Sequence, residues 1–248
     1  MFLRIDHIGV AVRNLEEAAD RLQKLLGLRL AEQERVEEQQ LIAALIPTDD
    51  VRFELMQPTS PDSVVGRFLE RRGEGIHHIC FEVGDIVAEI GTLKGREVQL
   101  IQGAPRQGFV GLVEFIHPRA AAGVLVEMAQ VSLRTPASTG LRLGAVSIAT
   151  AKGDAAALLW KRNFGMVEQG HEARPGGPGD SFKATRLSTP NREGRAVVEF
   201  LEPAHPQSVI AEFIKARGEG VYSLTLVAQS LEAIPYRSQV PGSAVIPP

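Results

Sequence analysis

The sequence repeats one pattern twice and loses its histidines in the second copy. The first copy contains SVVGRFLERRGEGIHHI and the second contains SVIAEFIKARGEGVYSL, so that His78 corresponds to Ser223. The N-terminal segment LRIDHIGVA likewise matches a later LRLGAVSIA, in which Ala145 takes the place of His7. A shared scaffold explains the repeat. The loss of both imidazoles indicates a function that only the first copy performs.

Length and composition limit the classes of protein to which the chain can belong. A repeat that spans more than half of the 248 residues predicts two similar domains. The formal net charge of -3, with Lys and Arg scattered along the chain, argues against nucleic-acid or membrane partners. No apolar run approaches the roughly 18 residues that span a bilayer, and Cys80 is the only cysteine. We expect a cytoplasmic protein without disulfides that acts on a small molecule.

The apolar pattern of residues 1–130 predicts two β-α-β-β-β units. Asn14 followed by Glu17 is a capping-box signal, and Gly27 ends the helix that follows it. The expected helices are 15–26, a short one ending at 72, and one from the Asp85 cap to 93 with a stop at Gly95; the expected strands are 3–12, 28–35, 41–46, 51–56, 76–83, 98–101, 112–116 and 124–128, with a glycine-rich loop at 103–111. The fold class is therefore α+β, with the paired units forming a curved mixed sheet.

After a linker at 131–140, residues 141–248 are expected to form a degenerate second domain of the same type. One β-α-β-β-β unit reaches 203, and a helix near 209–216 and a strand at 222–227 follow it. The tail 235–248 carries four prolines and offers no counterpart to the last two strands of the first domain. The second domain is therefore expected to be truncated. Its exposed sheet edge needs a cover from the first domain or from a second chain, as in a homodimer.

Two histidines and two carboxylates occupy equivalent places in the paired units of the first domain. His7 and His78 stand at matching positions of the first strand of each unit, while Glu54 and Glu127 each stand among apolar neighbours in the last strand. Such a donor set, held by rigid strands, suits a divalent first-row metal such as Co, Ni, Mn, Fe or Zn. Cys80 shares a strand face with His78, and we interpret it as a core thiol rather than a ligand.

Residues 1–130 resemble the methylmalonyl-CoA epimerases of the vicinal oxygen chelate (glyoxalase/bleomycin resistance/extradiol dioxygenase) superfamily. The motifs that carry the resemblance are IDHIGVAV, FELMQP, GEGIHHICFEV, FIHP and GVLVE. The resemblance implies paired β-α-β-β-β units around a metal, with His7, Glu54, His78 and Glu127 as its ligands. It also implies removal of the proton between a thioester carbonyl and a carboxylate, through a metal-stabilised enolate.

The chain departs from that family at one position. Inversion needs acid and base groups on both faces of the planar enolate, and Glu127 is the candidate for one of them. The second glutamate of the relatives falls at Ala43 in this sequence. The small molecule is then an acyl-CoA whose carboxylate the loop 103–111 could hold through backbone N–H groups. Arginines such as Arg106 and Arg119 could meet the phosphates of its CoA tail.

Other functions stay open from the sequence. A glyoxalase-type isomerase or an extradiol-type dioxygenase would use a related scaffold, although a coordinating Glu54 argues against the two-histidine, one-carboxylate iron site of a dioxygenase. A non-catalytic small-molecule binding protein is the third reading. The second domain fits that description, since it keeps a glutamate, Glu199, at the position that corresponds to Glu54 but has lost both histidines.

Overall fold

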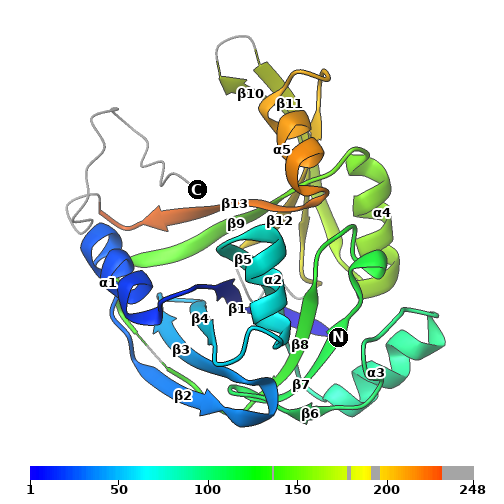
Figure 1. Cartoon of the computed structure of the whole chain (residues 1–248). Helices are drawn as coiled ribbons and strands as arrows, with labels where there is room; N and C mark the ends of the chain where they lie inside the picture. Colours follow the sequence, from blue (N-terminus) through cyan, green and yellow to red (C-terminus); the bar gives the residue numbers. More distant parts are fainter. Residues whose placement is uncertain (136, 178–179, 191–195, 231–248) are drawn as a thin grey trace. The chain divides into compact units, whose positions relative to one another are not determined.

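The computed structural model describes residues 1–135, 137–177, 180–190 and 196–230, and it contains two mixed β-sheets with helices (Figure 1). The first sheet has the strand order β2-β3-β4-β1-β5-β8-β7-β6, and the second has the order β10-β11-β12-β9-β13. Each sheet contains parallel pairs, such as β1 with β4, and antiparallel pairs, such as β3 with β4. The expected α+β class is confirmed. No helix in the described part of the chain is long and apolar enough to cross a bilayer.

The first sheet and its helices come from the first half of the chain. The elements are β1 (Phe2–Ala11), α1 (Leu15–Leu26), β2 (Glu32–Val36), β3 (Leu41–Pro47), β4 (Arg52–Pro58), α2 (Val64–Arg72), β5 (Gly75–Val83), α3 (Ile86–Gly95), β6 (Arg106–Gln107), β7 (Gly111–Ile116) and β8 (Val126–Val131). Short 3-10 turns occur at Glu37–Gln39 and Pro118–Ala120.

The second sheet repeats the first seven elements in the same order. They are β9 (Leu141–Ala149), α4 (Gly153–Phe164), β10 (Val167–Gly177), β11 (Asp180–Ser188), β12 (Val197–Pro203), α5 (Val209–Arg217) and β13 (Gly220–Ala228). In both sheets the last strand of a three-stranded antiparallel run pairs in parallel with the first strand of the sheet's repeat. These parallel pairs are β4 with β1 and β12 with β9. The expected tail at 235–248 lies outside the described residues.

Contacts between residues that are close in space divide the chain into two compact units. The first unit holds Met1–Asp6, His78–Leu133 and Leu143–Thr225, and the second holds His7–His77, Arg134–Arg142 and the segment from Leu226. Strands β1 and β5 therefore contribute residues to both units. Among the expected ligands, His7 and Glu54 belong to the second unit, whereas His78 and Glu127 belong to the first.

The helix ends follow from the side chains that the sequence places there. Asn14 accepts a hydrogen bond from the backbone N–H of Glu17, as the capping signal predicts, and its side-chain amide donates a second bond to the Glu17 carboxylate. Gly27 ends α1 in the left-handed conformation with φ 73°. Ser63 and Ser208 cap α2 and α5 in the same way, so the repeat extends to the caps.

Several expected elements differ in extent. The strand expected at 28–35 begins only at Glu32, because its register with β3 starts there. The strand expected at 98–101 is reduced to one bridge between Leu100 and Ile116, since the positive φ of Glu97 (59°) turns the chain just before it. Helix α3 continues through Gly95, and the expected loop at 103–111 contains the short strand β6.

An aromatic cluster joins the two halves of the chain inside the first unit. The ring of Trp160 on α4 is fully buried, with ring centroids 5.1 Å from Phe164, 5.5 Å from Phe200 and 6.1 Å from Phe81. Phe2 on β1 packs on Phe81 and Phe164 at 5.4 and 5.2 Å. All of these pairs except the tilted Phe2–Phe164 pair are edge-to-face, and such pairs add to the stabilisation from buried area. Helix α4 of the second half therefore shares a core with strands of the first.

We expect Trp160→Ala to lower the free energy of unfolding by about 3–5 kcal/mol, because it leaves a large cavity among packed aromatic rings. Urea denaturation followed by circular dichroism measures this change. Leu158→Ala is the matched control on the same helix, since Leu158 is exposed and its loss should cost less than about 0.5 kcal/mol. Equal effects of the two substitutions would contradict the shared core.

Candidate metal centre

His7 and Glu54 form the first histidine–carboxylate pair, and both lie in the second unit. Strands β1 and β4 are parallel, with Glu54 opposite Gly9, two residues along from His7. Residues two apart on a strand share a face, so the register brings the two side chains together. His7 Nε2 lies 3.3 Å from Glu54 Oε2. The pair is buried, with 1% and 8% of the residue surfaces exposed.

His78 and Glu127 form the second pair, in the first unit. Strand β5 is parallel to β8, and Glu127 lies opposite Cys80, two residues along from His78. His78 Nε2 lies 3.4 Å from Glu127 Oε2, and both residues are buried. The two pairs are thus built in the same way: a histidine on the first strand of a β-α-β-β-β repeat lies beside a glutamate on the last strand of the same repeat. This placement repeats the symmetry that the sequence indicates.

The spacing within each pair suits two ligands of one ion. A charge-assisted hydrogen bond between an imidazole and a carboxylate spans about 2.8 Å. Two atoms that each lie about 2.1 Å from one ion, at right or tetrahedral angles, are roughly 3.0–3.4 Å apart. The separations of 3.3 and 3.4 Å fall at the upper end of that range. Two imidazoles and two carboxylates are also the donors that divalent first-row metals accept, so the residues fit such an ion.

Among the described residues, two groups of side chains could hold a metal ion, and all of their members are buried. His7, Glu54 and His78 each offer one ligand atom, and these atoms lie within 4.8 Å of one another. Asp6, His7 and Cys80 form a second such group. Cys80 is buried, and its Sγ lies 3.9 Å from the backbone oxygen of Phe81. Both groups need His7, so they are alternatives.

His77 is next to His78 in the sequence, but its side chain packs against helix α2. Its ring packs edge to face on Phe68 of α2, with centroids 5.0 Å apart. Neighbouring residues on a strand point to opposite faces, which accounts for this position. His77 therefore offers a matched control for His78.

Phe115 is a site residue that the sequence reasoning did not single out. It lies opposite Glu127 in the β7–β8 register, and its ring packs edge to face on His78 at 5.6 Å. Arg106 also lies over this ring, with its guanidinium carbon 5.5 Å from the centroid. The signal was present in the motif FIHP, whose phenylalanine has the alternation of an inward-facing residue.

Ala43 lies on the face of the sheet that carries Glu54. In the β3–β4 register Leu45 is opposite Glu54 and Ala43 is opposite Met56, so all four side chains share one face. Ala43 is fully buried. On its other side, Glu34 of β2 lies directly opposite Ala43 and is exposed. A carboxylate therefore stands one strand away from the place where the sequence lacks one.

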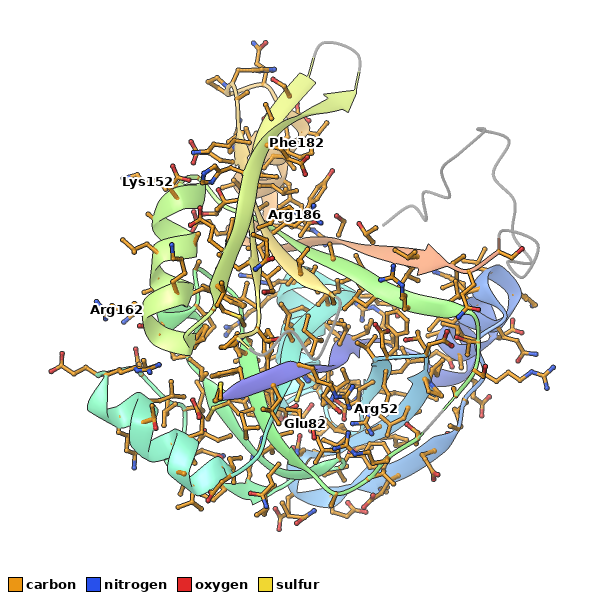
Figure 2. The ribbon with its side chains drawn as sticks, turned by 180° about the vertical axis from the view of Figure 1, so that it is seen from behind. Arg52, Glu82, Lys152, Arg162, Phe182 and Arg186 are labelled. Carbon is orange, nitrogen blue, oxygen red and sulfur yellow. The ribbon has the colours of Figure 1, made fainter. Side chains whose placement is uncertain are left out.

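The second sheet keeps the strand register but not the ligands. Glu199 of β12 lies opposite Ser147 of β9, as Glu54 lies opposite Gly9, and Ala145 stands where His7 would be. The carboxylate of Glu199 is 2% exposed, and it accepts a hydrogen bond from the Ser147 hydroxyl at 3.1 Å. Arg186, which projects from β11 in Figure 2, places its Nε 3.0 Å from Glu199 Oε1. The carboxylate of Glu199 is therefore paired with an arginine.

The strand register shows which residue differs beside the two carboxylates. Arg186 lies opposite Glu199, whereas Leu45 lies opposite Glu54 at the equivalent place of the first sheet. Leu45 cannot pair with a carboxylate, and Glu54 lies beside His7. Arg186 forms an ion pair with Glu199 and neutralises its charge. Arginine remains charged and is not a metal ligand, so the second sheet holds a structural ion pair at this position.

Comparison with known proteins matches the first half of the chain to the superfamily that its motifs resemble. The model of the Glyoxalase/Bleomycin resistance protein/Dioxygenase superfamily matches residues 6–118. The uncharacterized protein YqjC of Bacillus subtilis is 41% identical over 128 residues, which are 51% of this chain and 91% of that protein. Ethylmalonyl-CoA/methylmalonyl-CoA epimerase of Cereibacter sphaeroides is 34% identical over 134 residues, 53% of this chain and 100% of that protein.

A solved structure extends the likeness to three dimensions. A variant of Streptomyces coelicolor methylmalonyl-CoA epimerase in complex with 2-nitronate-propionyl-CoA superposes with a TM-score of 0.52 at 31% identity. The match covers 55% of this chain and 100% of that protein. Sequence relatives, family model and fold agree with the resemblance carried by the sequence motifs, and the chain belongs to the Glyoxalase/Bleomycin resistance protein/Dioxygenase superfamily.

Proposed function

We propose that the protein is a metal-dependent epimerase that acts on a 2-carboxyacyl thioester such as methylmalonyl-CoA. The observation that carries the proposal is the matched construction of the pairs His7–Glu54 and His78–Glu127. The relatives named as methylmalonyl-CoA epimerases support the substrate class. We propose these four residues as the ligands of one divalent ion, with Co, Ni, Mn, Zn and Fe as the candidates.

The proposed reaction begins with removal of the proton between the thioester carbonyl and the carboxylate. When bound, a divalent ion would supply positive charge beside the thioester oxygen, where negative charge gathers in an enolate. Glu127 has two carboxylate oxygens, so one can bind the ion while the other accepts the proton. Its burial keeps water away from the carboxylate and strengthens electrostatic interactions there.

The return of the proton decides whether the centre inverts. Inversion requires a donor on the face of the enolate opposite to Glu127. Ala43 supplies none, and apart from the proposed ligand Glu54 the nearest carboxylate in the strand register is Glu34, one strand farther out and exposed. We therefore propose that proton removal is fast and delivery to the opposite face is the slow step in this chain.

We expect methylmalonyl-CoA in heavy water to take up deuterium at least several-fold faster than it loses its configuration, because exchange needs one base and inversion needs a second group. Mass spectrometry measures the uptake, and chiral analysis of the acyl group measures the inversion. Equal rates would show that a donor replaces the missing glutamate. Glu34→Gln would then decide whether that carboxylate is the donor. No exchange with any 2-carboxyacyl thioester would overturn the proposed function.

We also propose a division of labour between two domains, 1–130 and 141–248, joined at 131–140. The first would bind the metal and substrate, and the second would serve packing. The aromatic cluster around Trp160 and the Arg186–Glu199 ion pair support this role for the second. Arg96 and Asn163 add a polar link, since Arg96 donates to the Asn163 carbonyl at 2.9 Å and Asn163 donates to the Ala120 carbonyl at 2.8 Å. We propose a cytoplasmic location, where a protein with a single cysteine and no intrachain disulfide is expected.

A further inference from the structure

Arg106 lies on the same face of the first sheet as Glu127. It is opposite Val113 in the β6–β7 register, and Val113 shares a face with Phe115, two residues along. Phe115 in turn lies opposite Glu127 in the β7–β8 register. All of these residues belong to the first unit. The strand register therefore carries an arginine from the edge of the sheet to the face where the proposed base stands.

Arg106 contacts an aromatic ring that also packs on His78. Its guanidinium carbon lies 5.5 Å from the centroid of Phe115, and that ring packs on His78 at 5.6 Å. A guanidinium over an aromatic face is attracted by the ring, which orients the side chain without neutralising its charge. Among the described residues, nothing forms a hydrogen bond with the buried Nε of Arg106. Arg106 is thus a positioned cation with an unused donor.

The hairpin that carries Arg106 is packed down onto the sheet. A Cβ at Gly108 would lie 2.9 Å from both methyl groups of Val113, and a Cβ at Gly111 would overlap the carbonyl oxygen of Gln130. The Gly108 N–H also donates to the Gly111 carbonyl at 2.8 Å. Both glycines allow close approach of the backbone, which fixes β6 and hence Arg106.

We propose that Arg106 binds the free carboxylate of the 2-carboxyacyl group and sets the preference of the site for such substrates. The inference rests on the proposed function and adds its specificity residue. A planar guanidinium matches a carboxylate in geometry and charge, and it can donate two parallel hydrogen bonds. A buried donor left unpaired disfavours a substrate that lacks the carboxylate. The alternative ligand, a phosphate of the CoA tail, would be bound equally in acyl-CoAs with and without that carboxylate.

The test compares two ligands that differ only in the carboxylate. Isothermal titration of the full-length metal-loaded protein with methylmalonyl-CoA and with propionyl-CoA gives the ratio of their affinities. A hydrogen-bonded charged group contributes about 10- to 100-fold in affinity. We expect Arg106→Gln to reduce that ratio by this factor while propionyl-CoA affinity stays within about twofold, and Arg106→Lys to restore part of it.

Arg119→Gln is the matched control, because Arg119 is exposed and lies outside the strand register described above. It should leave the ratio unchanged even if it weakens both ligands. Equal weakening of both ligands by Arg106→Gln would assign Arg106 to the CoA phosphates and overturn the inference. An unchanged ratio in Arg106→Gln, in a wild-type protein that exchanges the α-proton, would overturn the inference alone. Failure of the wild type to bind either ligand or to exchange the proton would overturn the proposed function as well.

Discussion

Replacing His78 with alanine should abolish metal binding, with a loss of affinity of more than about 100-fold. Substitution even of a group that only supports a ligand costs 10- to 100-fold, and loss of the ligand itself costs more. His78 is buried 3.4 Å from Glu127, so no solvent-facing side chain can take its place easily. At the equivalent position of the second sheet, Arg186 pairs with Glu199 and Ala145 stands in place of the histidine, so those residues do not replace the site. Elemental analysis of dialysed full-length protein and titration with Co²⁺ or Zn²⁺ measure the effect.

His77→Ala is the matched control for this substitution. Its imidazole packs on Phe68 of α2, so metal affinity should stay within about threefold of the wild type, although stability will fall with the lost ring contact. Circular dichroism shows whether each variant is folded. Comparable losses of metal from both variants would mean that the strand register assigned to His78 is wrong.

Replacing Glu127 with glutamine should slow deuterium exchange by at least about 100-fold for each bound ion. Glutamine keeps the shape of the side chain and one oxygen that can bind a metal, but it cannot accept the proton that a general base removes. The rate must be divided by the measured metal content, because the amide is a weaker ligand than the carboxylate. This normalisation separates the loss of the base from the loss of the ion.

Glu114→Gln is a suitable control for a buried glutamate on the neighbouring strand. Glu114 lies on the opposite face of β7 from Phe115, and its Oε1 accepts hydrogen bonds from the backbone N–H groups of Gln102 and Phe115. The variant keeps that oxygen and should exchange the proton at close to the wild-type rate. A Glu127→Gln variant that retains exchange within about threefold per bound ion would transfer the role of base to another group.

Local patterns in the sequence were enough to predict most elements of the fold. Asn14, Gly27 and Ser63 fix helix ends through their own hydrogen bonds or backbone conformation, and such signals are local. The extent of strands was less predictable, because a strand ends where its partner ends. Residues 28–31 have the composition of a strand but lie outside the β2–β3 register, and only Leu100 of the strand expected at 98–101 forms a bridge.

The site was predictable to the degree that the repeat reveals equivalent positions. Aligning the two units placed His78 rather than His77 at the position of His7, and ring packing puts His77 on Phe68. Contacts between strands distant in the sequence could not be read in this way. Phe115 on His78, Arg106 on Phe115 and Arg186 on Glu199 all depend on which strand lies beside which. The same reason hid the aromatic core around Trp160, whose rings come from both halves of the chain.

The most direct test of the proposed chemistry is a metal titration followed by proton exchange. Full-length protein stripped of metal is mixed with methylmalonyl-CoA in heavy water, and Co²⁺ is added in steps while mass spectrometry follows deuterium uptake. The account predicts no uptake above the spontaneous rate without metal, and a rise that saturates at one ion per chain. Uptake that is independent of metal, or no uptake at saturation with any of the candidate ions, would contradict it.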